Sequence, residues 1–342
     1  MASPFATDPA DAGVPSPDDV RRPRGARFGD AWLTGRTGGL LVSAALLFTV
    51  LTVVSDSFLS PYTMSVLSRQ VAFYVLIALA QSVCLIVGGM NLSVGAIGGI
   101  STVVLGLCLQ SAGLPGWLGV IVALAVGSLA GLVNGLLITK MRIDSFIVTL
   151  SMMFVYMGLR SGLSGGNPYR VPDSLTWVGQ GETLGVPYLF VLACGVLAAA
   201  AFVFRSTIFG RHLLATGGNI DAARLSGVNT NAMILAANTL SGVLSALAAV
   251  LWASKLGSAA PETGDNWLVA SFAVAIIGGT GLAGGVFSAA GLLLGGVVFM
   301  LIKHSLVELR ANDYYANAFL GGLILLAIIV DRVRESVEGR QR

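Results

Sequence analysis

The chain has 342 residues, of which 55% are hydrophobic and only 11% are charged. Soluble domains carry about 25% charged residues, so this composition excludes an ordinary soluble protein and indicates one that crosses a membrane several times. The net charge of +3 does not predict a nucleic-acid partner, because the basic residues gather at the ends of apolar runs.

Residues 1–36 differ in composition from the rest of the chain. The stretch up to residue 19 is rich in Pro, Ala and Asp, and no early apolar segment with a cleavage site is present, as a signal peptide would require. Five arginines follow, at positions 21, 22, 24, 27 and 36. We expect residues 1–36 to form a disordered cytoplasmic tail that ends in a basic anchor.

Intervals without Asp, Glu, Lys or Arg predict the membrane spans. A helix needs about 20 residues to cross the hydrocarbon core, so the longer intervals contain more than one span. Interval 70–139 is interrupted at Gly88–Gly95 (GGMNLSVG) and at Ser111–Gly116 (SAGLPG). Interval 266–302 is interrupted at Gly278–Gly285, and its first span is short enough to be a half-span. We expect an all-α polytopic protein with about ten spans, near residues 38–55, 70–87, 94–111, 117–139, 145–163, 186–204, 231–254, 266–280, 286–303 and 314–331.

The distribution of basic residues predicts the orientation. Ten spans place both termini on one side of the membrane. With a cytoplasmic N-terminus, 14 of the 20 Lys and Arg residues fall in cytoplasmic segments, in agreement with the positive-inside rule. We therefore expect a membrane domain over residues 37–331, and cytoplasmic tails at 1–36 and 332–342.

The interruption at Gly88–Gly95 carries two candidate residues of a substrate path, Asn91 and Ser93. Non-helical backbone at membrane depth is tolerated only where it is buried in protein or lines a wet cavity. Broken helices in transporters commonly mark the route of the substrate. The alternative for this stretch is a tight turn at the membrane surface.

The stretch Lys140–Leu150 (KMRIDSFIVTL) leads into the fifth expected span. Asp144 stands directly before this span and is predicted to be its N-cap, with Ser145 and Thr149 inside the helix. The functional alternative is that Phe146 and Thr149 face the translocation path.

A polar stretch, Gly210–Val228 (GRHLLATGGNIDAARLSGV), separates two long apolar runs. Gly217 and Gly218 are expected to break the chain, after which Asn219 is a plausible N-cap. Gly227 suits the C′ position at which a helix stops. The pattern predicts a short capped helix of about two turns outside the membrane, and an ordinary loop is the alternative.

Two charged residues of this stretch also fit a helix. Asp221 falls in the first turn, where the helix dipole favours an anion, and Arg224 falls near the last turn. Helices shorter than about 12 residues are marginal in water by themselves. The order of this one must therefore come from its caps, from the surrounding loop at 205–229, or from a partner.

Three stretches of the chain resemble the permeases of ABC importers for ribose, xylose and galactose. Gly210–Val228 resembles their G…A.GGN..AARLSG coupling segment, and Ile277–Gly285 resembles their IGGTSLSGG stretch. Gly88–Gly95 is similar to their GGIDLSVG stretch, except that Asn91 replaces the carboxylate. The resemblance covers roughly residues 60–331.

This resemblance implies a permease subunit in the inner membrane of a bacterium that imports a monosaccharide or similar polyol. It implies a second permease copy, two ATPase subunits, and a periplasmic or lipid-anchored sugar-binding protein. Ala222, Ala223 and Leu225 would pack closely on the ATPase. The residues expected to couple the chain to the ATPase are Arg211, Gly217, Gly218, Asn219, Asp221, Ala222, Ala223, Arg224 and Gly227.

No catalytic residue, cofactor or metal is expected in this chain. A phosphate-binding GxxxxGK[ST] loop does not occur in the sequence, so a partner must hydrolyse the ATP. The three cysteines lie inside apolar runs without metal-ligand spacing, at positions 84, 108 and 194.

Three other functions remain open at this point. The related permease branch for branched-chain amino acids shares the fold and the mechanism. A secondary transporter would need coupling ions, and the spans lack acidic or basic residues that could carry protons, although Na⁺ coupling through backbone carbonyls stays open. A membrane enzyme would need a cluster of His, Cys or carboxylate side chains at membrane depth, which the sequence does not contain.

Overall fold

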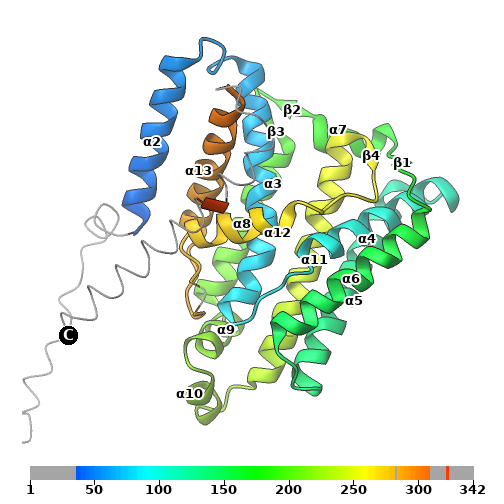
Figure 1. Cartoon of the computed structure of the whole chain (residues 1–342), viewed down its shortest axis with the longest axis vertical. Coiled ribbons are helices and arrows are strands. Elements are labelled where there is room, and N and C mark those ends of the chain that lie inside the picture. Colours follow the sequence, from blue (N-terminus) through cyan, green and yellow to red (C-terminus); the bar gives the residue numbers. More distant parts are fainter. Residues whose placement is uncertain (1–35, 282, 309–320, 323–342) are drawn as a thin grey trace, which may run out of the picture.

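The computed structural model describes residues 36–281, 283–308 and 321–322. Most of this part is helical and the strands are only two residues long, so the expected all-α class is confirmed (Figure 1). The helices are α2 (Arg36–Val54), α3 (Pro61–Ile86), α4 (Val94–Gly106) with its π-helical extension η2 (Leu107–Ser111), α5 (Gly116–Lys140), α6 (Ser145–Ser164), α7 (Asp173–Gln180), α8 (Tyr188–Ser206), α9 (Ile208–Gly218), α10 (Ile220–Leu225), α11 (Thr230–Leu256), α12 (Trp267–Ile277) and α13 (Ala289–Glu308).

Seven of the described helices are long and apolar enough to cross a membrane. Two shorter apolar helices accompany them, in α2 and in the 11-residue α12, which fits the half-span expected there. Nine of the ten expected spans thus coincide with described helices. The tenth, near residues 314–331, lies outside the described residues except for 321–322, as do the two expected tails.

The second span begins at Pro61, nine residues before the expected start at residue 70. Ser60 caps this helix by accepting a hydrogen bond from the N–H of Thr63, and proline at the first helical position needs no partner for its missing N–H. Arg69 therefore lies inside α3 instead of ending the span. Its guanidinium donates to the Gln180 carbonyl at 2.7 Å and to Glu182 at 2.9 Å, so the charge is neutralised at the end of the bundle.

The core of the bundle is α3, which contacts α8, α11, α12 and α13 and buries most of its side chains. Beside it, α11 packs closely on α5 through small residues. A methyl group at Gly131 would collide with the carbonyl of Asn238, and one at Gly242 with the carbonyl of Gly127. Such close approach of backbones is how helices associate in lipid, where the hydrophobic effect does not drive them together.

Four two-residue strands lie with α7 at one end of the bundle, whereas α9 and α10 lie at the opposite end (Figure 1). Antiparallel pairing joins β1 (Tyr169–Arg170) to β4 (Ser258–Ala259), and β2 (Glu182–Thr183) to β3 (Val186–Pro187). We call the end with α7 the strand end and the end with α9 and α10 the α10 end.

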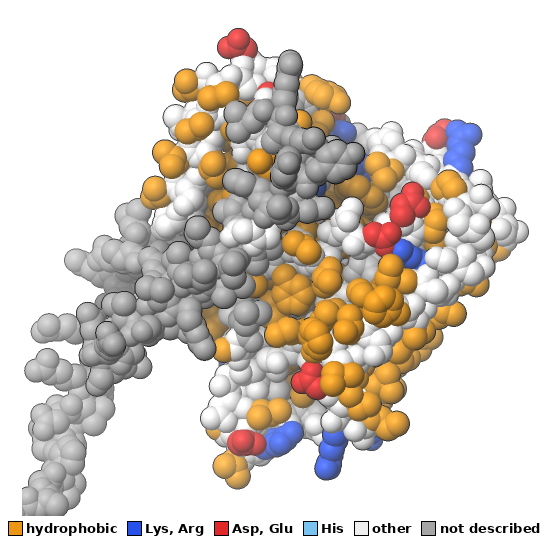
Figure 2. Space-filling model, in the orientation of Figure 1, with side chains coloured by type: hydrophobic (Ala, Val, Ile, Leu, Met, Phe, Trp, Pro, Cys, Tyr) orange, Lys and Arg blue, Asp and Glu red, His pale blue; other side chains and the backbone are white. Residues whose placement is uncertain are grey.

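The two ends differ in charge. At the α10 end the structure describes the basic residues Lys140, Arg142, Arg205, Arg211 and Arg224 and the acidic residues Asp144 and Asp221. At the strand end it describes the basic residues Arg69, Arg160, Arg170, Lys255 and Lys303 and the acidic residues Asp56, Asp173, Glu182, Glu262, Asp265 and Glu308. On the face seen in Figure 2, basic side chains gather near α10, and hydrophobic side chains cover much of the surface between the ends.

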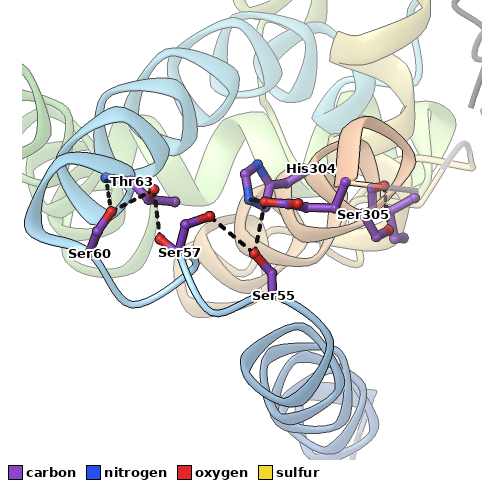
Figure 3. A network of polar contacts seen from close by, with 8 residues as sticks. Ser55, Ser57, Ser60, Thr63, His304 and Ser305 are labelled. Atoms are coloured by element: carbon purple, nitrogen blue, oxygen red, sulfur yellow. Dashed lines mark hydrogen bonds and ion pairs between the residues drawn. The ribbon is translucent and has the colours of Figure 1, made fainter. Parts of the chain in front are cut away.

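A polar network fastens α2 to α13 at the strand end (Figure 3). Ser55, which directly follows α2, donates to Glu308 at the end of α13 over 3.1 Å. His304 lies one turn earlier on α13, with its Nε2 atom 3.5 Å from the same Glu308 oxygen. Ser57 contacts Ser55 at 3.2 Å and accepts a hydrogen bond from Thr63 through its carbonyl. The network holds the C-terminal ends of α2 and α13 side by side.

Candidate functional site

The polar stretch between α8 and α11 folds into two helices outside the long apolar helices. The expected N-cap at Asn219 is confirmed, because its Oδ1 atom accepts hydrogen bonds from the N–H groups of Asp221 (3.1 Å) and Ala222 (3.0 Å). The expected break at Gly217 and Gly218 is wrong. α9, which the sequence did not predict, runs through both glycines, and the break falls at Asn219, whose backbone is extended.

The C-terminal stop of α10 at Gly227 is also confirmed. Gly227 has a φ of 83°, which favours glycine, and its N–H donates to the carbonyl of Arg224 at 3.0 Å. The N–H of Val228 reaches back to the carbonyl of Ala223 over the same distance. These two bonds form a Schellman motif, which satisfies carbonyls that a helix end leaves without partners. α10 is therefore closed at both ends by bonds within this chain.

The exposed face of α10 differs from the expected one. Ala223 is only 5% exposed and packs inside the chain, so it is not available to a partner, contrary to expectation. Ala222 is exposed, and Leu225 is 91% exposed. An isolated leucine exposed to this degree, on a helix outside the apolar bundle, is a candidate anchor for another protein.

The charged residues of this segment form weak contacts with the rest of the chain. Asp221 and Arg224 lie 3.8 Å apart and are both exposed, so their ion pair contributes little stability. Arg224 also donates through Nε to the hydroxyl of Thr230 at 2.9 Å. Arg211, on α9, is exposed and lies 3.4 Å from the carbonyl of Ser206. These guanidinium groups keep free donors at the surface.

The break between α3 and α4 is held by an amide that lies inside the protein. Asn91 is fully buried, and its Oδ1 atom accepts from the N–H (3.0 Å) and the hydroxyl (2.6 Å) of Ser93. Its Nδ2 atom donates to Ser241 of α11 at 2.9 Å. The amide acts as donor and acceptor at once, which a carboxylate in this position could not do.

Further buried side chains extend this network. Ser93 accepts a hydrogen bond from Asn134 of α5 at 2.8 Å, and Asn134 in turn accepts one from the hydroxyl of Tyr156 of α6 at 3.0 Å. No motif in the sequence singles out Asn134, Tyr156 or Ser241. The available signal was that Asn134 is an amide within a long charge-free run, where an unpaired amide is costly.

The first turn of α6 holds the other side of the break. The predicted N-cap at Asp144 is confirmed by a 2.8 Å bond from the N–H of Phe146. Ser145 accepts from the N–H of Met90, and Thr149 accepts from the N–H of Leu92, both at 3.2 Å. Of the four candidate path residues, Asn91, Ser93 and Thr149 are thus fully buried around the break, whereas Phe146 is 47% exposed.

The three stretches selected from the sequence meet in one glycine junction. The N–H of Gly285 donates to the carbonyl of Ile86, at the end of α3, over 2.8 Å. A methyl group on Gly217 would collide with the same carbonyl, and one on Gly284 would press on Gly217 and Gly88. The end of α9 is therefore in backbone contact with the start of the break and with the turn that follows α12.

A cleft of 680 Å³ opens at the α10 end, between the loop that precedes α6 and the start of α11. We call it the α10 cleft. It is lined by Ile138, Thr139, Arg142, Ile143, Asp144, Arg224, Asn231 and Ile234. Within residues 36–281, 283–308 and 321–322, no group of three His, Cys, Asp or Glu side chains could hold a metal ion.

A bundle of apolar spans in which two spans are joined by a buried non-helical stretch is an architecture of membrane transport proteins. The chain is such a permease component. It belongs to the family described as "Branched-chain amino acid transport system / permease component", whose profile matches residues 63–328.

The curated relatives of the chain include two kinds of import permease. The ribose import permease protein RbsC of Escherichia coli (strain K12) is 29% identical over 317 residues, which cover 90% of this chain and 97% of that protein. The autoinducer 2 import system permease protein LsrC of Yersinia pseudotuberculosis serotype O:1b is 32% identical over 312 residues, covering 89% and 87%. No solved structure matches the chain.

Proposed function

We propose that this chain is the permease subunit of an ABC importer for a monosaccharide or a similar polyol. The observation that carries the proposal is α10, a helix outside the apolar bundle that is closed at both ends and presents Leu225 to the solvent. The names of the relatives support import of a sugar-like solute. The ATP would be hydrolysed by a separate subunit bound at the α10 end.

The α10 end is proposed to face the cytoplasm of the bacterium, and the strand end the outside. Cytoplasmic segments carry an excess of Lys and Arg, and the α10 end has five basic and two acidic residues among those described. The strand end has five basic and six acidic residues. A substrate-binding protein would dock at the strand end, and a second permease copy would complete the route for the sugar.

The proposed coupling runs from α10 through α9 to the broken helix. ATP binding would move the ATPase against Ala222, Leu225 and Arg224 on the exposed face of α10. Through Gly217, α9 touches the end of α3, where the break begins. Asn91, Ser93 and Thr149 are proposed to set the shape of the break, beside which the sugar would pass when the bundle opens.

Replacing Leu225 by Glu tests the docking of the ATPase on α10. Burying a leucine contributes about 1.5–3 kcal/mol, and a buried unpaired carboxylate opposes binding further. We expect co-purification of a co-expressed ATPase subunit to fall by about tenfold or more, with sugar uptake falling in parallel. Leu184→Glu is the matched control, because Leu184 is 98% exposed at the strand end and should leave the ATPase bound. Normal ATPase binding by Leu225→Glu would contradict the proposal.

Import of a branched-chain amino acid is the second candidate, because the family description names that transport system. The purified complex of permease, ATPase and binding protein separates the two candidates. Sugars such as ribose are expected to stimulate its ATP hydrolysis. Stimulation by leucine, isoleucine or valine in place of sugars would favour the second candidate.

A further inference from the structure

The α10 cleft has two walls, and only one of them belongs to the proposed coupling helix. Arg224 of α10 and Asn231 of α11 line one side. The opposite side includes Arg142, Ile143 and Asp144, which lie in the connection from α5 to α6 at the same end of the bundle. A partner that binds α10 is therefore beside this second wall.

Arg142 stands out within this second wall because of its backbone. Its φ is 56°, in the left-handed region, where only one other non-glycine residue among those described is found. It occupies the C′ position after α5, which glycine occupies without strain. An arginine here adds a conformational cost that a glycine would avoid, which indicates that the side chain serves a purpose.

The α10 cleft contains two exposed guanidinium groups, which are accessible to a partner. Arg142 is exposed, and it has no hydrogen bond or ion pair within the part of the chain that the structure describes. Arg224 is exposed as well, donates through Nε to Thr230, and forms only a loose 3.8 Å ion pair with the exposed Asp221. The carboxylate of Asp144, which also lines the cleft, caps α6 through one oxygen and offsets one of the two positive charges. A guanidinium offers paired donors that match a carboxylate, so the complementary partner is acidic.

We propose that the α10 cleft is a second docking site for the ATPase subunit, where Arg142 binds a carboxylate of that subunit. This inference rests on the proposed function and adds a contact on the other side of α10. The residues that follow Arg142 lead directly into Ser145 and Thr149, which hold the break between α3 and α4. The ATPase would thus act on the break between α3 and α4 from two sides, through α9 and through the start of α6.

Arg142→Gly tests this contact, because glycine keeps the left-handed backbone and removes only the side chain. Because the variant loses a hydrogen bond between charged groups, we expect its affinity for the purified ATPase subunit to fall by about tenfold or more. The affinity is measured with the permease in nanodiscs. Arg142→Lys should recover part of the affinity by retaining the charge. Lys140→Ala is the matched control, since Lys140 is exposed two residues away and does not line the cleft.

The melting temperature of the permease alone is measured for each variant, and Arg142→Asn replaces the glycine variant if that one fails to fold, because Asn also tolerates this backbone. Reduced ATPase affinity with an unchanged melting temperature supports the inference. Unchanged affinity in Arg142→Gly, while Leu225→Glu abolishes binding, overturns the inference and leaves the proposed function intact. Unchanged affinity in both variants overturns both.

Discussion

Gly217 and Gly218 are neighbours at the end of α9, yet their surroundings are opposite. A side chain on Gly217 would collide with the backbone of Ile86, whereas one on Gly218 would meet nothing within 4 Å. The pair therefore separates the effect of the glycine junction from the general effect of alanine in a helix.

We expect Gly217→Ala to destabilise the protein by about 1–3 kcal/mol, the usual range for overpacking, and to reduce uptake. Gly218→Ala should leave stability unchanged or slightly raised, because alanine favours helix. Thermal unfolding of the two variants in detergent, together with uptake in cells, measures both effects. Equal behaviour of the two variants would show that the close contact at Gly217 has no role.

Local patterns in the sequence predicted the residues whose partners are close in the chain. Asn219 and Asp144 could be identified as caps from the residues beside them, because the backbone N–H that each one binds lies only two residues further on. Asn91 has a local partner in Ser93, but the residue that accepts from its Nδ2 atom, Ser241, lies 150 residues away, and no local pattern points to it. The buried side of α10 was also not predictable, because six residues are too few to define an apolar face, and this is why Ala223 was misplaced.

At the scale of elements, composition predicted the long apolar helices well, and it failed where polar or glycine-rich sequence forms a helix. α9 contains Arg211, Gly217 and Gly218, which are typical of loops, but Thr207 caps it and Gly217 fits against α3. The expected start of the second span, residue 70, is too late because the charge of Arg69 ends the charge-free interval there, whereas α3 begins at Pro61. A paired charge at the end of a bundle does not end a helix.

One ion pair joins two elements at the strand end. Arg160, buried near the end of α6, donates to the carbonyl of Thr263 at 3.0 Å and to the carboxylate of Asp265, just before α12. A buried charge that loses its partner is strongly destabilising. Because Asp265 is partly exposed, water replaces some of the lost interaction.

We expect Asp265→Ala to lower the free energy of unfolding by about 1.5–3 kcal/mol, the range for a hydrogen bond to a charged group. The measurement is thermal or denaturant unfolding of the purified permease. Glu262→Ala changes an exposed position in the same segment, where the described part of the chain offers no partner, and should change the stability by less than about 0.5 kcal/mol. A similar loss in both variants would mean that the pair does not hold α6 to α12.

At the scale of the whole molecule, the two ends of the bundle can be tested for their side of the membrane. Leu184 is 98% exposed at the strand end, and Ser226 is exposed directly after α10. Cys84 and Cys108 are buried and Cys194 is partly exposed, so a background with all three replaced by serine removes native thiols.

In that background, we expect Leu184→Cys to react with a membrane-impermeant maleimide in spheroplasts, in which the outer membrane is open and the inner membrane is closed. Ser226→Cys should react only after the inner membrane is opened. This result follows from the excess of basic residues at the α10 end. The reverse labelling pattern would invert the proposed orientation and remove α10 from the reach of a cytoplasmic ATPase.

The two caps of α10 also determine how stiff the helix is before any partner arrives. Ordering flexible groups on binding costs about 0.5–1.5 kcal/mol for each mobile side chain, and a disordered loop adds backbone entropy. Because Asn219 and Gly227 already fix the backbone of α10, the proposed docking would avoid that part of the entropic loss. A stiff α10 also keeps Ala222 and Leu225 at fixed positions relative to each other on its exposed face.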